Sequence, residues 1–126
     1  MKIIHHIADL AGHEGGTLVP TMGALHEGHA SLIKKAICYN RPTIVSVFVN
    51  PTQFGPNDDF KKYPRQLDKD IQMAKESGAD ILFAPTIKSI YPKRFSITPE
   101  PLPLVATKPN LEDLYRPEHF QGVLQV

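Results

Sequence analysis

The sequence contains a single cysteine, Cys38, so an intramolecular disulfide framework is excluded and the residue is interpreted as structural. It also has no long hydrophobic run: its most apolar stretch, residues 43–49, is far shorter than the roughly 20 residues of a membrane span. The N-terminus has neither the long apolar stretch nor the cleavage site of a secretory signal. We therefore expect a cytoplasmic protein with no membrane partner.

An excess of charge of one sign is lacking as well. Fourteen basic and thirteen acidic residues leave a formal net charge of +1, and no basic stripe with interleaved aromatic residues is present. Nucleic-acid binding therefore has no electrostatic support. The composition, with 41% hydrophobic and 21% charged residues, is that of a globular protein, and 126 residues fit one domain, which we expect to cover residues 1–126.

Strand patterns alternate with helix patterns along the chain. Residues 17–20, 43–49 and 80–85 are predicted strands, and the second is almost wholly apolar and β-branched, as in a parallel sheet covered on both faces. The order β-α-β-α-β predicts an α/β fold, a Rossmann-like parallel sheet with flanking helices. The later part is less regular, with edge strands expected within residues 95–105, a short helix over 110–115 and a further element from Glu118.

Two segments have apolar residues at helical spacing. They cover residues 30–39 and 65–77. The side chains expected to face the core are Leu32, Ile33, Ala36 and Ile37 in the first segment and Leu67, Ile71, Met73 and Ala74 in the second.

Polar side chains follow each predicted strand. Thr21-Met22-Gly23 follows the first strand, Asn50-Pro51-Thr52-Gln53 the second and Thr86 the third. Because ligands of an open parallel sheet bind beyond the carboxyl ends of the strands, these loops are the candidate site.

The strongest single signal is His26-Glu27-Gly28-His29, at the start of the first predicted helix. A helix N-terminus offers unpaired backbone N–H groups and the positive end of the helix dipole, which attract phosphate. Two imidazoles there can donate hydrogen bonds to a nucleotide and stabilise the charge that builds as its α-phosphorus is attacked. Gly28 between them allows a close approach of backbone and ligand.

Other interpretations of the two histidines remain open. They could be solvent-exposed residues at a helix cap. A zinc site is weaker, because the helical zinc pattern needs histidines at i and i+4 and because no cysteine pair or third nearby ligand is present, so no metal site is expected. The glycine patterns of phosphate-binding loops and of dinucleotide-binding folds are also missing.

Five ordered blocks resemble the pantoate–β-alanine ligase (pantothenate synthetase) family. They are Pro20-Thr21-Met22-Gly23-Ala24-Leu25-His26-Glu27-Gly28-His29, Val47-Phe48-Val49-Asn50-Pro51-Thr52-Gln53-Phe54-Gly55, Tyr63-Pro64-Arg65, Ile90-Tyr91-Pro92 and Arg116-Pro117-Glu118-His119-Phe120-Gln121-Gly122-Val123. The resemblance implies membership of the His-x-Gly-His nucleotidyltransferase superfamily. It also implies condensation of pantoate with β-alanine through a pantoyl-adenylate, with ATP and Mg²⁺, and release of AMP and pyrophosphate.

The resemblance also assigns roles to residues. His26 and His29 are implied to be catalytic, and the ATP site would comprise Pro20, Thr21, Met22, Gly23, His26, Gly28 and His29. Met22, Asn50 and Gln53 would bind pantoate, and Tyr63 would lie on a loop near the site. His119 is interpreted as structural, and Asp58 and Asp59 as part of a solvated loop.

Family members extend beyond the length of this chain, which resembles their N-terminal half. From this we expect the C-terminal domain of the family to be absent and the 126-residue chain alone to be inactive or nearly so. The resemblance further implies a homodimer. Two alternatives stay open: another adenylyl- or cytidylyltransferase of the superfamily, and a non-catalytic binding or dimerisation module.

Overall fold

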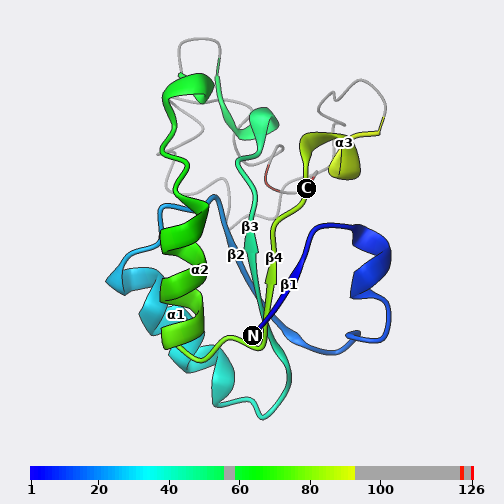
Figure 1. Ribbon diagram of the computed structural model, residues 1–126, viewed down its shortest axis with the longest axis vertical. Coiled ribbons are helices and arrows are strands. Elements are labelled where there is room, and N and C mark those ends of the chain that lie inside the picture. Colours follow the sequence, from blue (N-terminus) through cyan, green and yellow to red (C-terminus); the bar gives the residue numbers. More distant parts are fainter. Residues whose placement is uncertain (56–58, 93–122, 124–125) are drawn as a thin grey trace, which may run out of the picture. The chain divides into compact units, whose positions relative to one another are not determined.

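A computed structural model describes residues 1–55, 59–92, 123 and 126 (Figure 1). The chain divides into two compact units: Met1–Val49 with Pro64–Ile90, and Asn50–Tyr63 with Tyr91–Val126. A single domain over residues 1–126 stays a prediction. The elements predicted within 95–105 and 110–115 and from Glu118, together with His119 and Asp58, lie outside the described residues.

The first unit contains a four-stranded parallel sheet. Its strands are β1 (Lys2–Ile4), β2 (Thr17–Thr21), β3 (Thr43–Val47) and β4 (Ile81–Phe83), in the order β1-β4-β3-β2. Val19 of β2 pairs with Val45 of β3, which pairs in turn with Leu82 of β4. The predicted Rossmann-like α/β fold is confirmed, and β1 is a strand that the sequence analysis missed.

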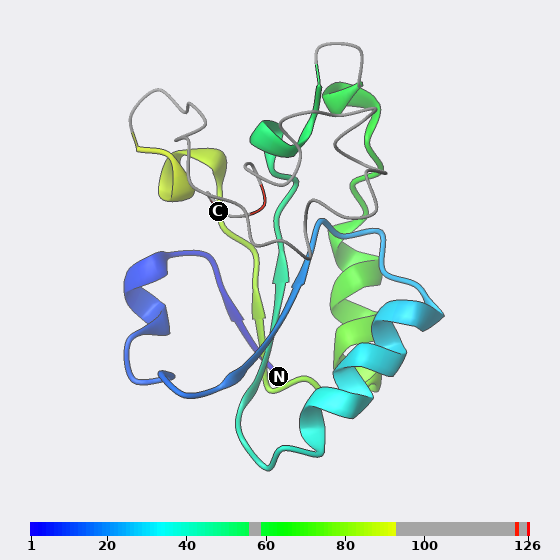
Figure 2. The same ribbon diagram turned by 180° about the vertical axis from the view of Figure 1, so that it is seen from behind.

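Two helices cover one face of this sheet. α1 (Glu27–Ile37) contacts β2 and β3, and α2 (Leu67–Glu76) contacts β3 and α1. Figure 2 shows both helices on the same side, with the 3₁₀ helix η1 (Ile7–Leu10) on the other. The short helix α3 (Ile87–Ile90) follows β4. Within the described part of the chain, no helix is both long and apolar enough to cross a bilayer.

Successive side chains of each strand point to opposite faces of the sheet, and apolar side chains form a core on each face. Val19, Val45 and Leu82 face the helices and pack in one cluster with Ile33 and Ala74. Ile4, Ile44, Ile81 and Phe83 form the cluster on the opposite face, where Leu10 packs against them. The central strands of this sheet therefore carry apolar side chains on both faces, as the sequence predicted for residues 43–49.

The helix faces differ in part from the prediction. Ile33 and Ala36 are buried, but Leu32 and Ile37 are 57% and 39% exposed, and so is Leu67 at 39%. The buried stripe of α1 consists of Ala30, Ile33 and Ala36, spaced by three residues, and is narrower than expected. Residues directly next to that stripe turn about 100° away from it, into solvent.

The described residues of the second unit include two 3₁₀ helices, η2 (Pro51–Gln53) and η3 (Phe60–Lys62). Phe54 packs edge-on against Phe60 and Tyr63, with ring centroids 5.3 and 5.6 Å apart. Asp59 caps η3 by accepting a hydrogen bond from the Lys62 N–H, and the same two exposed residues form an ion pair of 3.1 Å. Asp59 thus has a local structural role in an exposed turn.

Candidate functional site

The connection from β2 to α1 makes a tight turn at the carboxyl end of the sheet. Thr21 ends β2, donates its hydroxyl to the Ser46 carbonyl at 2.8 Å and accepts the Gly23 N–H at 3.1 Å. Gly23 and Ala24 follow with φ values of +83° and +53°. The left-handed region suits glycine but is unfavourable for alanine. The surroundings of the turn therefore hold Ala24 in a backbone conformation that is unfavourable for alanine.

The two histidines of this connection form a reciprocal cap on α1. His26 is the N-cap residue, and its Nδ1 accepts the Gly28 N–H at 3.1 Å. His29 reaches back, and its Nδ1 accepts the His26 N–H at 3.2 Å. The ring centroids lie 4.2 Å apart. Two unpaired N–H groups of the helix start are thereby satisfied, and the predicted position of both histidines at a helix N-terminus is confirmed.

This cap defines where each imidazole carries its proton. A backbone N–H is always a donor, so the Nδ1 atom that it faces must offer a lone pair, and the proton of the neutral ring lies on Nε2. His26 and His29 therefore each keep an Nε2–H donor that the cap does not use. For His29, partial burial and the nearby His26 lower the pKa, while Asp70 opposes this shift. The neutral form of His29 is favoured.

A third residue in the first unit, Asp70, was missed by the sequence analysis. It lies on α2 at 2% exposure, and its carboxylate accepts the N–H groups of Ala24 at 3.1 Å and Leu25 at 2.7 Å. Its position carried a signal: Asp70 falls three residues after Leu67 and four before Ala74, on the stripe expected to face the core. A carboxylate there needs a buried partner, and the turn before His26 supplies it.

The second unit has its own polar cluster around Asn50. This residue is 1% exposed, and its Oδ1 accepts hydrogen bonds from the Thr52 N–H, the Thr52 hydroxyl and the Tyr91 hydroxyl, at 3.2, 2.8 and 2.9 Å. Its Nδ2 donates to Oε1 of Gln53 at 2.8 Å. The side chain of Asn50 therefore fixes the direction of the Gln53 carboxamide. Tyr91 is a further member of the cluster that the sequence analysis did not assign to the site.

The candidate residues fall into two groups, one in each unit. The β2–α1 connection and the end of β2 bring together Pro20, Thr21, Met22, Gly23, His26, Gly28 and His29. The other unit holds Asn50 and Gln53, joined by a hydrogen bond, and Tyr63, which contacts Phe54. The roles of these residues toward ligands stay predictions.

The family model described as pantoate-beta-alanine ligase matches residues 2–126. The chain belongs to this family. Two solved structures of pantothenate synthetase from Thermus thermophilus resemble it at 42% and 44% identity, with TM-scores of 0.83 and 0.82. The first match includes 99% of this chain and 46% of the Thermus chain, and the second includes 98% of this chain and 45% of the Thermus chain.

A third similar structure is pantoate-beta-alanine ligase from Francisella tularensis, complexed with beta-gamma ATP and beta-alanine. It is 44% identical to this chain with a TM-score of 0.82, and the match includes 99% of this chain and 50% of the Francisella chain. The chain thus spans about half the length of these family members.

Proposed function

We propose that this chain carries the ATP-binding and pantoate-binding part of an ATP-dependent, AMP-forming pantoate–β-alanine ligase. Family membership and the identity to solved pantothenate synthetases support this. The complex of the Francisella relative with beta-gamma ATP and beta-alanine supports the same two substrates here. The chain would then act as a nucleotide-binding domain whose active site includes the turn before α1.

The proposed reaction has two steps. A carboxylate oxygen of pantoate attacks the α-phosphorus of ATP, the bond to the bridging oxygen breaks, and pyrophosphate leaves with that electron pair. The amine of β-alanine then attacks the acyl carbon of the pantoyl-adenylate, and AMP leaves. In the first step negative charge builds on the phosphate oxygens, so the residues that accelerate it are hydrogen-bond donors already in position.

The arrangement of His26 and His29 is the observation that carries the proposal. Because each Nδ1 is occupied by a backbone N–H, each Nε2–H remains as a donor for a phosphate oxygen. Rings held by the helix cap lose little further entropy when a nucleotide binds, which favours affinity and orientation. We assign the catalytic role to these two imidazoles.

The neighbouring residues are assigned to the two ligands. Pro20, Thr21, Met22, Gly23 and Gly28 would shape the ATP site, and Met22 would add an apolar wall for pantoate. In the second unit, Gln53 and Asn50 would provide the polar anchor for pantoate, with Asn50 holding the Gln53 carboxamide. Tyr63 would contribute a loop contact.

Mg²⁺ would enter as the complex with ATP. The described residues contain no group of three or more His, Cys, Asp or Glu side chains that could hold a metal ion. Mg²⁺ is commonly bound through substrate phosphates and waters with few protein ligands, which fits delivery on the nucleotide.

Titration calorimetry with a non-hydrolysable ATP analogue and Mg²⁺ tests the nucleotide site. We expect binding by the unmodified chain and a loss of about tenfold or more in affinity in His26→Ala and in His29→Ala, since each removes a hydrogen bond to a charged group. His6→Ala is the matched control, because His6 is exposed and its side chain makes no cap hydrogen bond. Failure of the unmodified chain to bind, or an equal loss in the control, would contradict the proposal.

Exchange of labelled pyrophosphate into ATP tests the acceptor. If pantoate is the acceptor, a protein that completes adenylation exchanges labelled pyrophosphate into ATP only when pantoate is present. His29→Ala should abolish that exchange. Exchange that depends on a different acceptor instead would identify another adenylyl- or cytidylyltransferase.

We further propose a homodimer in the cytoplasm. Among the described strands β2 lies at the edge of the sheet, its Leu18 is 58% exposed, and an apolar side chain there fits a protein interface. The exposed, unpaired Cys38 fits a reducing compartment. Light scattering on the chain and on Leu18→Lys tests the assembly: a dimer that the substitution dissociates supports it, and a monomeric unmodified chain refutes it.

A further inference from the structure

We propose that Asp70 is a positioning residue whose buried carboxylate fixes the turn that carries His26 and His29. The proposal goes beyond the roles given to the two histidines, although its ligand-binding arm rests on the proposed nucleotide site. Three observations within the first unit carry it: the two hydrogen bonds of the carboxylate, the backbone shape that they hold, and the close approach of Gly23.

The hydrogen bonds are the first observation. Oδ2 of Asp70 accepts the Ala24 N–H at 3.1 Å, and Oδ1 accepts the Leu25 N–H at 2.7 Å. Two adjacent backbone donors thus meet the two oxygens of one side chain, a pairing that a carboxylate satisfies and a carboxamide cannot. The bonds connect α2 with a segment 45 and 46 residues away in sequence. They end one residue before the N-cap histidine.

The backbone shape is the second observation. Ala24 has a φ of +53°, which is unfavourable for a residue with a Cβ atom. Such a conformation persists where its surroundings hold it in place, and it is common at functional sites. The carboxylate of Asp70 holds the N–H of this residue and the next. If these two bonds were lost, the turn would relax and the path of the chain into His26 would change.

The third observation is the space at Gly23. A Cβ atom at this position would lie 2.9 Å from Oδ2 of Asp70 and 3.0 Å from Cγ1 of Val47, and φ here is +83°. Glycine therefore allows both the turn and the close approach of the carboxylate. The carboxylate also acts on the neighbouring imidazole, because the Asp70 charge opposes the lowering of the His29 pKa by burial and by His26. The buried carboxylate of Asp70 therefore influences both the position of the turn before the histidine cap and the protonation of His29.

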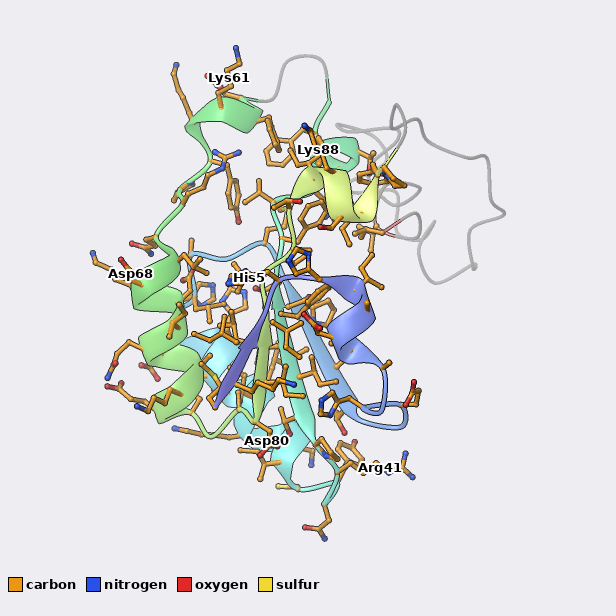
Figure 3. All side chains as sticks on the ribbon, turned by 45° about the vertical axis from the view of Figure 1, so that its right-hand side comes forward. His5, Arg41, Lys61, Asp68, Asp80 and Lys88 are labelled. Atoms are coloured by element: carbon orange, nitrogen blue, oxygen red, sulfur yellow. The ribbon has the colours of Figure 1, made fainter. Side chains whose placement is uncertain are left out.

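The variant Asp70→Asn tests the proposal, and Asp68→Asn is its matched control. Asp68 lies on the first turn of the same helix and is exposed, as Figure 3 shows. Asparagine keeps the size of the side chain but presents an NH₂ group to one of the two N–H donors. We expect the amide hydrogens of Ala24 and Leu25 to exchange about tenfold faster or more in Asp70→Asn, which corresponds to about 1.4 kcal/mol. In Asp68→Asn they should exchange at the unmodified rate.

Two further readouts separate positioning from a general loss of structure. The amides of Val45 and Leu82, in the buried strands, should exchange at unchanged rates. The pKa of His29, followed by NMR of its ring, should fall further in Asp70→Asn and stay unchanged in Asp68→Asn. Equal acceleration at Val45 and Leu82, or unchanged exchange at Ala24 and Leu25, would overturn the proposal.

Binding of the non-hydrolysable ATP analogue with Mg²⁺ completes the test. If Asp70 positions the histidines, Asp70→Asn binds the analogue about tenfold more weakly or worse, while Asp68→Asn binds it normally. Equal binding by both variants would overturn the positioning role. If the unmodified chain binds no analogue, the proposed function fails, and the exchange and titration measurements still decide whether Asp70 holds the turn.

Discussion

Gly28 lies directly against the imidazole of His26: a Cβ atom at position 28 would come within 2.8 Å of Cε1 and 3.0 Å of Nδ1. The glycine donates its N–H to that Nδ1, so the ring can approach the backbone only because no side chain intervenes. Glycine is normally unfavourable inside a helix, by about 1 kcal/mol relative to alanine. Its presence near the start of α1 is explained by the cap that it permits.

The substitution Gly28→Ala should therefore separate stability from binding. We expect the His26 ring to move away and the affinity for the ATP analogue to fall about tenfold or more. The free energy of unfolding should change by less than about 1 kcal/mol, because the gain in helix propensity offsets the lost cap bond. Calorimetry and urea unfolding measure the two effects, and Lys35→Ala, an exposed change on the same helix, is the control. Unchanged affinity would show that the His26 cap is irrelevant to binding.

The lowered pKa of His29 makes stability depend on pH in a defined direction. Above its ordinary pKa of 6.5 the imidazole is neutral in the folded and unfolded states alike. As the pH falls below that value, the unfolded chain takes up the proton first, so the free energy of unfolding declines until the folded form is protonated too. Urea unfolding between about pH 5 and pH 8 should show this decline. His29→Ala should lose this contribution, whereas His6→Ala should retain it; identical slopes for all three proteins would refute the assignment.

Adjacent residues on α1 test which face of the helix is buried. Ile33 is fully buried and Leu32 is 57% exposed, although the sequence pattern placed both toward the core. Ile33→Ala should lower the free energy of unfolding by about 2–5 kcal/mol, since it leaves a cavity beneath the sheet. Leu32→Ala should change it by less than about 0.5 kcal/mol. Comparable losses in both variants would mean that Leu32 is covered, as a dimer interface over this helix would cause.

Periodicity was sufficient to predict β2, β3, β4 and the two long helices, because these elements bury continuous apolar stripes. It missed β1, whose three residues Lys2–Ile4 are too few to show a period and become a strand through pairing with β4. It also began the first helix at residue 30, whereas α1 starts at Glu27, because the cap is made by histidines and not by the usual small polar residues. Helix starts depend on such side-chain contacts.

The site could be predicted only as far as it is local in sequence. The positions of His26, Gly28 and His29 at a helix start follow from spacing within a few residues. The bond between Asp70 and Ala24 joins residues 46 apart, so the helical stripe indicates that Asp70 is buried but does not show which residues its carboxylate meets. Tyr91 is similar, since its hydroxyl meets Asn50 from 41 residues away.

The Asn50 cluster leads to a final prediction about the second unit. Asn50→Leu removes the acceptor that the Thr52 and Tyr91 hydroxyls share, and we expect the unfolding free energy to fall by about 2–3 kcal/mol. Asn50→Asp keeps that acceptor but replaces the NH₂ donor that faces Oε1 of Gln53 by a second oxygen. Gln53 must then turn its own NH₂ toward position 50.

This difference separates orientation from stability. Asn50→Asp should therefore weaken pantoate binding, because the carboxamide that we assign to pantoate is reversed, while its unfolding free energy falls less than that of Asn50→Leu. Tyr91→Phe removes one hydroxyl, is expected to lower the unfolding free energy by about 1 kcal/mol, and leaves the Asn50–Gln53 bond in place. Calorimetry with pantoate and urea unfolding measure these effects. Normal pantoate affinity in Asn50→Asp would show that the direction of Gln53 is not what pantoate recognises.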